Sequence, residues 1–219
     1  MSADPPELKI ADYGMGNLRS VAKAFEHVGV DASISADPTE LGAAQAIVLP
    51  GVGAFPEAMR EIDHRGLGEA IRERAAAGVP LLGICLGMQL LFDSSTEHGG
   101  AAGLGLLAGT VEALRAPELK LPHIGWAHLR IDSPSPLTGG IAAGEPFYFV
   151  HSFTARPDPE DLIASADYGE RFAAVVGRGN VFGTQFHPEK SSRAGLLMLR
   201  NFAALAAAAG APAERRRRC

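Results

Sequence analysis

The chain has 219 residues, of which 47% are hydrophobic and 21% charged, so a packed core is expected rather than disorder. This length suffices for one substantial domain and is short for two with independent cores. The formal net charge is −5, although four arginines form a run at residues 215–218. An acidic body with a short basic tail lacks the basic face that nucleic acids require, so no nucleic-acid partner is expected.

Targeting signals are also missing from the sequence. No apolar stretch reaches the roughly 18 residues that cross a bilayer, so no membrane association is expected. The first seven residues lack the basic start and apolar run of a secretory signal. Of the two cysteines, Cys85 lies in an apolar run and Cys219 is the last residue, which argues against a disulfide framework. These features together predict a cytoplasmic protein.

The first half of the chain alternates short apolar runs with helical periodicity. We expect strands at residues 8–12, 46–49 and 79–84, and helices at residues 18–28, 57–64, 67–77 and 86–92. Asn17 is a suitable N-cap for the first helix. The run at 79–84 shows no alternation, which is typical of a central parallel strand buried on both faces.

The second half is richer in strand signals, and its turns predict a mixed sheet. We expect strands at residues 110–114, 128–131, 147–150, 172–176 and 181–185, and a last helix from 192 to about 208. The whole pattern predicts a doubly wound α/β fold, with a mixed, mainly parallel sheet and helices on both faces. It predicts a single domain at residues 8–208 between a flexible N-terminus (1–7) and a flexible basic tail (209–219).

A candidate nucleophile stands between the strand at 79–84 and the helix expected after it. Residues 83–87 read Gly-Ile-Cys-Leu-Gly, the thiol counterpart of the G-x-S-x-G turn that exposes a nucleophile at a sharp strand-to-helix corner. The dipole of the following helix favours the thiolate of Cys85, and the N–H of Leu86 is free to stabilise an oxyanion. Alone, such a cysteine is equally typical of a small buried core residue.

A candidate base and its orienting group lie much later in the chain. His187 and Glu189 are separated only by Pro188, which we expect to hold the segment extended, so that both side chains point to one side. The carboxylate then binds one imidazole nitrogen, and the other nitrogen faces the thiol. This is the nucleophile–base–orienter logic of a catalytic triad. Alone, the pair is more typical of a loop histidine beside a solvated glutamate, and it supports the triad only together with the cysteine motif.

These motifs resemble those of the class I (triad-type) glutamine amidotransferases, a family with a flavodoxin-like fold. Residues 83–89 and 187–189 resemble its two signature motifs, and Pro-Gly-Val-Gly at 50–53 resembles its oxyanion strand. Residues 12–21, 122–126, 148–152 and 187–192 further resemble the glutaminase subunits of imidazole glycerol phosphate synthase, an enzyme of histidine biosynthesis. The resemblance covers about residues 8–205.

The resemblance implies roles for further residues. Catalysis falls to Cys85, His187 and Glu189, which release ammonia from glutamine without a cofactor. The oxyanion hole is implied at Gly51, Val52 and Leu86. Glutamine binding is implied at Gly53, Gln89, Glu97, His151 and Ser152, where the backbone of the last two seats the substrate. Trp126 and Tyr148 are implied at the face that binds the partner.

The implied partner is a (β/α)₈-barrel cyclase that receives the ammonia and makes imidazole glycerol phosphate. In this family the glutaminase is nearly idle until the partner site is occupied, and residues 50–53 are implied as the switch. One position departs from the pattern, since Ala127 stands where the family usually has asparagine. That change bears on a side-chain contact near the partner face.

Three other interpretations remain open from the sequence: the glutaminase of another synthase, such as anthranilate or pyridoxal phosphate synthase; a cysteine peptidase or esterase; and a non-catalytic binding module. Nucleotide binding is disfavoured because the third glycine of G-x-G-x-x-G is replaced by Arg19. No metal site is predicted, because His123 and His128 lack further ligands nearby.

Overall fold

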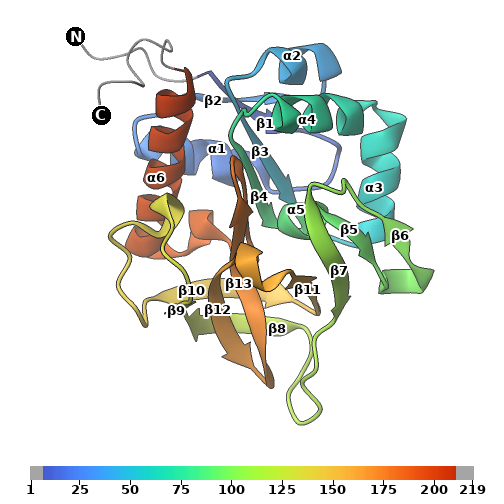
Figure 1. Ribbon diagram of the computed structural model, residues 1–219, viewed down its shortest axis with the longest axis vertical. Coiled ribbons are helices and arrows are strands. Elements are labelled where there is room, and N and C mark those ends of the chain that lie inside the picture. The colour runs from blue at the N-terminus through green and yellow to red at the C-terminus, as the bar shows by residue number, and fades with distance from the viewer. Residues whose placement is uncertain (1–6, 211–219) are drawn as a thin grey trace.

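A central sheet of eight strands organises the computed structural model, which describes residues 7–210 (Figure 1). Neighbouring strands pair in parallel from β2 to β14 and antiparallel from β14 to β9. The predicted mixed, mainly parallel α/β sheet is therefore confirmed. The strands across the sheet are β2 (Ala32–Ser35), β1 (Leu8–Ala11), β3 (Ala46–Gly51), β4 (Leu81–Cys85), β14 (Val181–Thr184), β13 (Glu170–Arg178), β12 (Leu162–Tyr168) and β9 (Arg130–Ile131).

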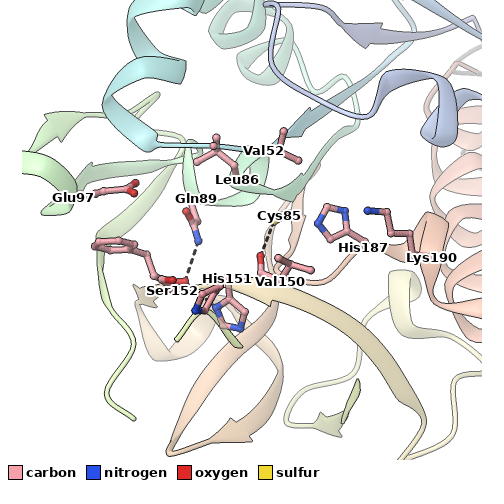
Figure 2. Close-up of a pocket in the computed structure, with 13 residues that line it drawn as sticks. Val52, Cys85, Leu86, Gln89, Glu97, Val150, His151, Ser152, His187 and Lys190 are labelled. Carbon is pink, nitrogen blue, oxygen red and sulfur yellow. Dashed lines mark hydrogen bonds between the residues drawn. The ribbon is translucent and has the colours of Figure 1, made fainter. Parts of the chain in front are cut away.

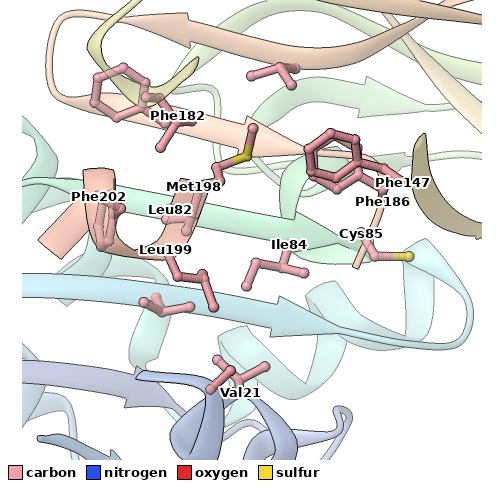
Figure 3. Packing of buried hydrophobic residues seen from close by; sticks show 14 of the residues in the cluster. Val21, Leu82, Ile84, Cys85, Phe147, Phe182, Phe186, Met198, Leu199 and Phe202 are labelled. Atoms are coloured by element: carbon pink, nitrogen blue, oxygen red, sulfur yellow. The ribbon is translucent and has the colours of Figure 1, made fainter. Parts of the chain in front are cut away.

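Helices cover both faces of this sheet, as the alternation of strands and helices predicted. On one face, α1 (Leu18–His27) and α6 (Ser192–Gly210) share a core with the sheet residues Leu82 and Ile84 (Figure 3). The opposite face carries α2 (Pro38–Ala43), α3 (Phe55–His64) and α4 (Leu67–Ala76). Along β3, Val48 belongs to the first core while Ile47 and Leu49 belong to the second, because successive side chains of a strand point to opposite faces.

Two smaller sheets extend the fold beside the ends of the central strands (Figure 1). Strands were expected at 110–114 and 147–150, but the sequence did not predict that they form sheets separate from the central one. They consist of β8 (His123–His128) with β10 (Pro146–His151), and of β11 (Phe153–Pro157), β7 (Leu107–Ala113), β5 (Phe92–Ser95) and β6 (Ala101–Ala102). The single strand expected at 128–131 was wrong, because His128 ends β8 and Arg130 begins the separate strand β9. Within residues 7–210, four short 3₁₀ turns are η1 (Glu97–Gly99), η2 (Pro136–Thr138), η3 (Pro159–Asp161) and η4 (Pro188–Lys190).

The helix expected at residues 86–92 was also wrong, because α5 spans only Leu86–Gln89. The carbonyls of Leu90 and Leu91 accept hydrogen bonds from the N–H groups of Leu104 and Leu106, which draws the chain away from the helix. Every residue from 86 to 92 is buried, so the apolar spacing there reflected burial on all sides rather than an amphipathic helix.

The boundaries of the described chain differ slightly from expectation. Asn17 occupies the N-cap position of α1, but its side chain makes no capping hydrogen bond. Helix α6 runs to Gly210 instead of ending near residue 208. The flexible ends predicted at residues 1–7 and 209–219 fall mainly on residues 1–6 and 211–219, which lie outside the described part. Between residues 7 and 210, no helix combines the length and apolar character needed to traverse a bilayer.

The packing of α6 on α1 gives a test of the core. Phe202 is fully buried and meets the ring of Phe25 edge to face at 6.4 Å. We expect Phe202→Ala to lower the free energy of unfolding by about 3–5 kcal/mol, because it leaves a cavity between the helix and the sheet. Arg200→Ala, on the exposed side of α6, serves as the control and should change it by about 0.5 kcal/mol or less. Urea unfolding followed by circular dichroism measures both, and equal stability of the two variants would contradict the packing described.

Candidate active site

A pocket of about 290 Å³ opens where β3, β4 and β14 end, and Cys85 lies at its centre (Figure 2). Figure 2 shows His187 on one side of the sulfur and Gln89 on the other. The pocket thus collects residues from both halves of the sequence. Its wall consists of Val52, Gly53, Cys85, Leu86, Gln89, Glu97, Pro122, Val150, His151, Ser152, Phe153, His187 and Lys190.

Cys85 ends β4 in a backbone conformation that residues other than glycine rarely adopt, with φ 56° and ψ −112°. The two flanking glycines make this corner sterically possible. A Cβ atom on Gly87 would overlap the carbonyl oxygen of Leu49, and one on Gly83 would lie 2.6 Å from the carbonyl oxygen of Gly87. Such strain is characteristic of a nucleophile held at a strand-to-turn corner.

The helix dipole expected to support the thiolate is smaller than the sequence indicated. Because α5 contains only four residues, few peptide dipoles align behind Cys85. The sulfur is instead faced by two separate polar groups. The thiol donates to the carbonyl of Val150 at 3.7 Å, and the side-chain nitrogen of Gln185 lies 4.0 Å from the sulfur.

His187 and Glu189 are in contact as predicted, but the backbone conformation between them differs from the expected one. Nδ1 of His187 lies 2.8 Å from Oε1 of Glu189, whose side chain is only 1% exposed. The segment expected to be extended is instead the 3₁₀ turn η4 with Pro188 at its first position. Proline suits this position because its fixed φ matches a helical turn and the first N–H has no internal partner. The other imidazole nitrogen is left for Cys85.

The electrostatics of His187 reflect these two neighbours. Burial by itself lowers its pKa, but the hydrogen bonds to Cys85 and Glu189, together with their negative charges, outweigh burial and raise the pKa to about 9. The imidazolium form of His187 is therefore favoured at neutral pH. A stable thiolate–imidazolium pair is the reactive state of a cysteine nucleophile.

Gln185 is a site residue that sequence reasoning left without a role. Gln89 donates to the carbonyl of Phe153 at 3.0 Å and to Oε1 of Gln185 at 2.9 Å. A carbonyl can only accept, so the nitrogen of Gln89 must face Phe153, and the oxygen of Gln185 must face Gln89. The amino group of Gln185 therefore points at Cys85. A polar residue directly after a buried strand and two positions before His187 was the available signal.

His123 is a second residue whose place the sequence did not reveal. Its Nδ1 lies 3.1 Å from Nε2 of His151, whose Nδ1 donates to the carbonyl of Phe153 at 2.9 Å. Burial lowers the pKa of His123 and, more strongly, that of His151, which falls to about 4. Both rings are neutral at pH 7 and rigidify the wall beneath the pocket. Across residues 7–210, no group of three or more acidic, histidine or cysteine side chains is arranged to hold a metal ion.

The residues predicted for the oxyanion hole do not all reach the pocket. Val52 and Leu86 lie on its wall, together with Gly53, whose φ is +102°. Gly51 instead lies behind the wall, buried against the hydroxyl of Tyr13. The sequence placed Gly51 correctly on the strand, but it could not show which way the peptide faces.

All four of the other residues predicted to bind the substrate line the pocket: Gln89, Glu97, His151 and Ser152. Gln89 is buried rather than exposed, and its amide is occupied by Phe153 and Gln185. One carboxylate oxygen of Glu97 accepts the N–H of Phe55 at 2.8 Å, at the start of α3. This bond fixes the carboxylate in the pocket wall.

Comparison with known proteins places this site in a family. The family described as "Glutamine amidotransferase class-I" matches residues 9–205. An imidazole glycerol phosphate synthase subunit HisH of Moorella thermoacetica is 52% identical over 93% of this chain and 97% of its own length. The HisH subunit of Geobacillus kaustophilus is 50% identical over 92% and 98%. The chain belongs to the class I glutamine amidotransferases, within the HisH family.

Solved structures agree on the fold of this HisH-family chain. A crystal structure of a glutamine amidotransferase superposes with a TM-score of 0.72 at 21% identity, over 91% of this chain and 98% of that one. A structure of PurLQS from Thermotoga maritima gives 0.70 at 23% identity, over 90% and 97%. The family expected from the sequence is confirmed, and the HisH relatives decide against the other synthases and against a peptidase. Being a HisH subunit of a synthase implies a partner subunit.

Trp126 and Tyr148, the residues predicted at the partner face, lie outside the pocket on a neighbouring surface. They pair across β8 and β10, with ring centroids 5.9 Å apart, and Trp126 is 53% exposed. Ala127, the position that departs from the family pattern, is buried in the core. Because strand neighbours alternate, Ala127 points away from the surface that carries Trp126. The departure therefore bears on core packing rather than on a surface contact.

The raised pKa of His187 gives a test of the pair. We expect the imidazole to titrate at about 9 in the wild-type chain and at least about one unit lower in Cys85→Ala, which loses the bond and charge of the thiolate. NMR titration of the histidine ring protons measures both, with exposed His27 on α1 as the internal reference.

The same shift predicts a pH dependence of stability. The folded pKa of His187 lies above its unfolded value of about 6.5, so its stabilisation is complete below pH 6.5. This stabilisation is lost as the pH rises through 9. The free energies of unfolding of wild type and Cys85→Ala, measured with urea across this range, should therefore converge at high pH. An identical His187 titration in both proteins would show that the thiol and imidazole do not interact.

Proposed function

We propose that this HisH-family chain hydrolyses glutamine to glutamate and ammonia at Cys85 and passes the ammonia to a cyclase subunit. One observation carries the proposal. Cys85 and His187 border the same pocket, and Glu189 holds the far side of the imidazole at 2.8 Å. Nucleophile, base and orienting carboxylate are thus arranged in the order that thiol-dependent amide hydrolysis requires.

The reaction proceeds in two stages. The Cys85 thiolate attacks the side-chain amide carbon of glutamine, and the His187 imidazolium protonates the departing ammonia. His187 then takes a proton from water, which hydrolyses the thioester to glutamate. Glu189 stabilises the imidazolium, and its buried carboxylate has one oxygen, Oε2, without a hydrogen-bond partner. That oxygen adds negative charge next to the ring without a competing donor.

Backbone N–H groups of Val52 and Leu86 hold the oxyanion that forms during attack, since both residues lie on the pocket wall beside Cys85. One such donor lowers the barrier by about 3–4 kcal/mol. Glycines flank Val52 on both sides, so its peptide reorients at low steric cost. We place the switch that keeps the chain idle without its partner in this strand, at residues 50–53.

Glutamine fits the remaining walls of the pocket. The carboxylate of Glu97 lines the pocket and suits the α-ammonium group of a free amino acid. The chain around His151 and Ser152 borders the same space and offers backbone groups for seating the substrate. The neutral His151 adds no charge that would repel the ammonium.

The partner is a (β/α)₈-barrel cyclase, which docks on the exposed face of β8 and β10 and makes imidazole glycerol phosphate. This face carries Trp126 and Ile124, which are 53% and 61% exposed, beside Tyr148. Exposed apolar and aromatic side chains of this kind are enriched at the centres of protein interfaces. Pro122 lies on the pocket wall and directly precedes β8, so this surface adjoins the site that releases ammonia.

The assignment of nitrogen delivery is tested by Cys85→Ala in the presence of the cyclase. We expect glutamine-driven turnover to fall at least about a thousandfold, because no other nucleophile lines the pocket in a comparable position. Turnover with added ammonium salt should persist at the wild-type level. Product formation is followed by absorbance, and wild type with ammonium is the control. Loss of both activities would contradict a role confined to supplying ammonia.

The docking face is tested by Trp126→Ala. We expect the dissociation constant for the cyclase to rise about thirtyfold, equivalent to about 2 kcal/mol, which is typical of a central aromatic residue. Ile34→Ala removes an exposed apolar side chain from edge strand β2, which lies far from β8 and β10 in Figure 1, and should leave the constant unchanged. Calorimetric titration measures both, and equal constants for the two variants would place the interface elsewhere.

A further inference from the structure

The segment at residues 12–17, Asp-Tyr-Gly-Met-Gly-Asn, has no role in the mechanism above, yet it lies against the oxyanion strand. Tyr13 within it is fully buried, although it carries a polar hydroxyl. A Cβ atom on Gly53 would lie 2.7 Å from Cε of Met15, so the segment contacts the strand at a second point. Neither Tyr13 nor Met15 lines the pocket, so both act from behind its wall.

The hydroxyl of Tyr13 extends the sheet where the backbone pairing stops. Strands β1 and β3 pair only as far as Ile10 with Val48, whereas β3 continues to Gly51. Beyond that point the Tyr13 hydroxyl donates to the carbonyl of Pro50 at 2.9 Å. Pro50 has no N–H of its own, so this carbonyl is its only backbone group able to hydrogen-bond. The hydroxyl therefore holds the end of β3 from the side that β1 has left.

Gly51 is confined by the same contact. A Cβ atom at this position would overlap the Tyr13 hydroxyl, and it would lie 3.0 Å from Cβ of Leu86 and 3.1 Å from the nitrogen of Gly87. Gly51 also pairs with Cys85 across β3 and β4. The glycine is thus enclosed between the tyrosine and the turn that carries the nucleophile. Tyr13 on one side and the turn at Leu86 and Gly87 on the other therefore set its position relative to Cys85.

We propose that Tyr13 is a positioning residue that fixes the Pro50–Gly51 peptide, so that only the following peptide, which carries the N–H of Val52, is free to reorient. The inference rests on the proposed function, because it concerns where the oxyanion donor stands relative to the sulfur. A donor that wanders from the developing oxyanion loses much of its effect on the barrier. The tyrosine therefore acts on the chemical step through the strand and not through contact with glutamine.

The chemistry of the phenol suits a permanent donor. Burial raises the pKa of Tyr13, and the nearby Cys85 raises it further, so the phenol remains protonated across the working range of pH. Its proton always has the Pro50 carbonyl as acceptor. The contact is therefore constant while Cys85 and His187 change charge during turnover.

Tyr13→Phe tests the proposal, because it removes the hydroxyl and retains the buried ring. In the full-length chain with the cyclase, we expect the kcat for glutamate release to fall about tenfold, less than the loss caused by deleting an oxyanion donor outright. The KM for glutamine should stay within about twofold, because Tyr13 does not line the pocket. Alkylation of Cys85 by iodoacetamide forms no oxyanion, so its rate should match that of the wild type.

Thr138→Val is the matched control. It also removes a buried hydroxyl that donates to a backbone carbonyl, that of Ser135 at 3.1 Å, but it lies in η2 outside the pocket wall. We expect wild-type kcat, KM and alkylation rate in this variant. An equal fall of kcat in both variants, or a wild-type kcat in Tyr13→Phe, overturns the proposal. So does a fall in the alkylation rate that parallels the fall in kcat.

Amide hydrogen exchange provides a readout that does not depend on turnover. We expect a peptide that covers residues 49–54 to exchange about tenfold faster in Tyr13→Phe than in wild type, and no faster in Thr138→Val. Wild-type exchange in Tyr13→Phe overturns the positioning role. If the wild-type chain and its partner release no glutamate at all, the proposed function fails, and the exchange experiment alone decides the role of Tyr13.

Discussion

The parallel pairing of β4 with β14 is the constraint on which the site depends. Ile84 pairs with Thr184, so the chain that leaves β14 runs beside the corner at Cys85 although a hundred residues separate the two segments. Gln185 and His187 reach the sulfur from this neighbouring strand. The site forms where the carboxyl ends of adjacent parallel strands meet, which is where doubly wound sheets place their ligands. A shift of one residue in this pairing would turn His187 away from the thiol.

The sequence predicted the parts of the site that depend on local chemistry. Glycines on both sides of Cys85 are needed because neighbouring backbone leaves no room for a side chain, and this requirement is visible as a motif. His187 and Glu189 are only two residues apart, so the predicted contact forms even though the backbone between them is a 3₁₀ turn and not an extended segment. The buried run at 79–84 likewise predicted a central strand, because residues buried on both faces show no alternation.

The parts that failed depend on contacts distant in sequence. Residues 86–92 resembled a helix, but the carbonyls of Leu90 and Leu91 are taken by the chain at 104–106, which no local pattern reveals. The carbonyl of Phe153 orients the amide of Gln89, and Gln89 in turn orients the amide of Gln185. These three residues come together only in the folded chain. Strand β8 was missed because it is stabilised by pairing with β10 and had no strong signal of its own, whereas β10 was expected at 147–150.

Two sides of the pocket wall differ in their hydrogen-bonded support, and this difference suits the proposed chemistry. Beneath Cys85, the neutral pair of His123 and His151 and the amides of Gln89 and Gln185 form a continuous hydrogen-bonded support. Opposite this support, Val52 and Gly53 are exposed, and glycines adjoin Val52 on both sides. In the proposed mechanism, the nucleophile stands on the hydrogen-bonded side, while the glycines beside Val52 allow its peptide to reorient at low steric cost. Under the positioning role proposed for Tyr13, its buried hydroxyl holds the Pro50 carbonyl, so that reorientation is confined to the next peptide and the oxyanion donor keeps its place relative to Cys85.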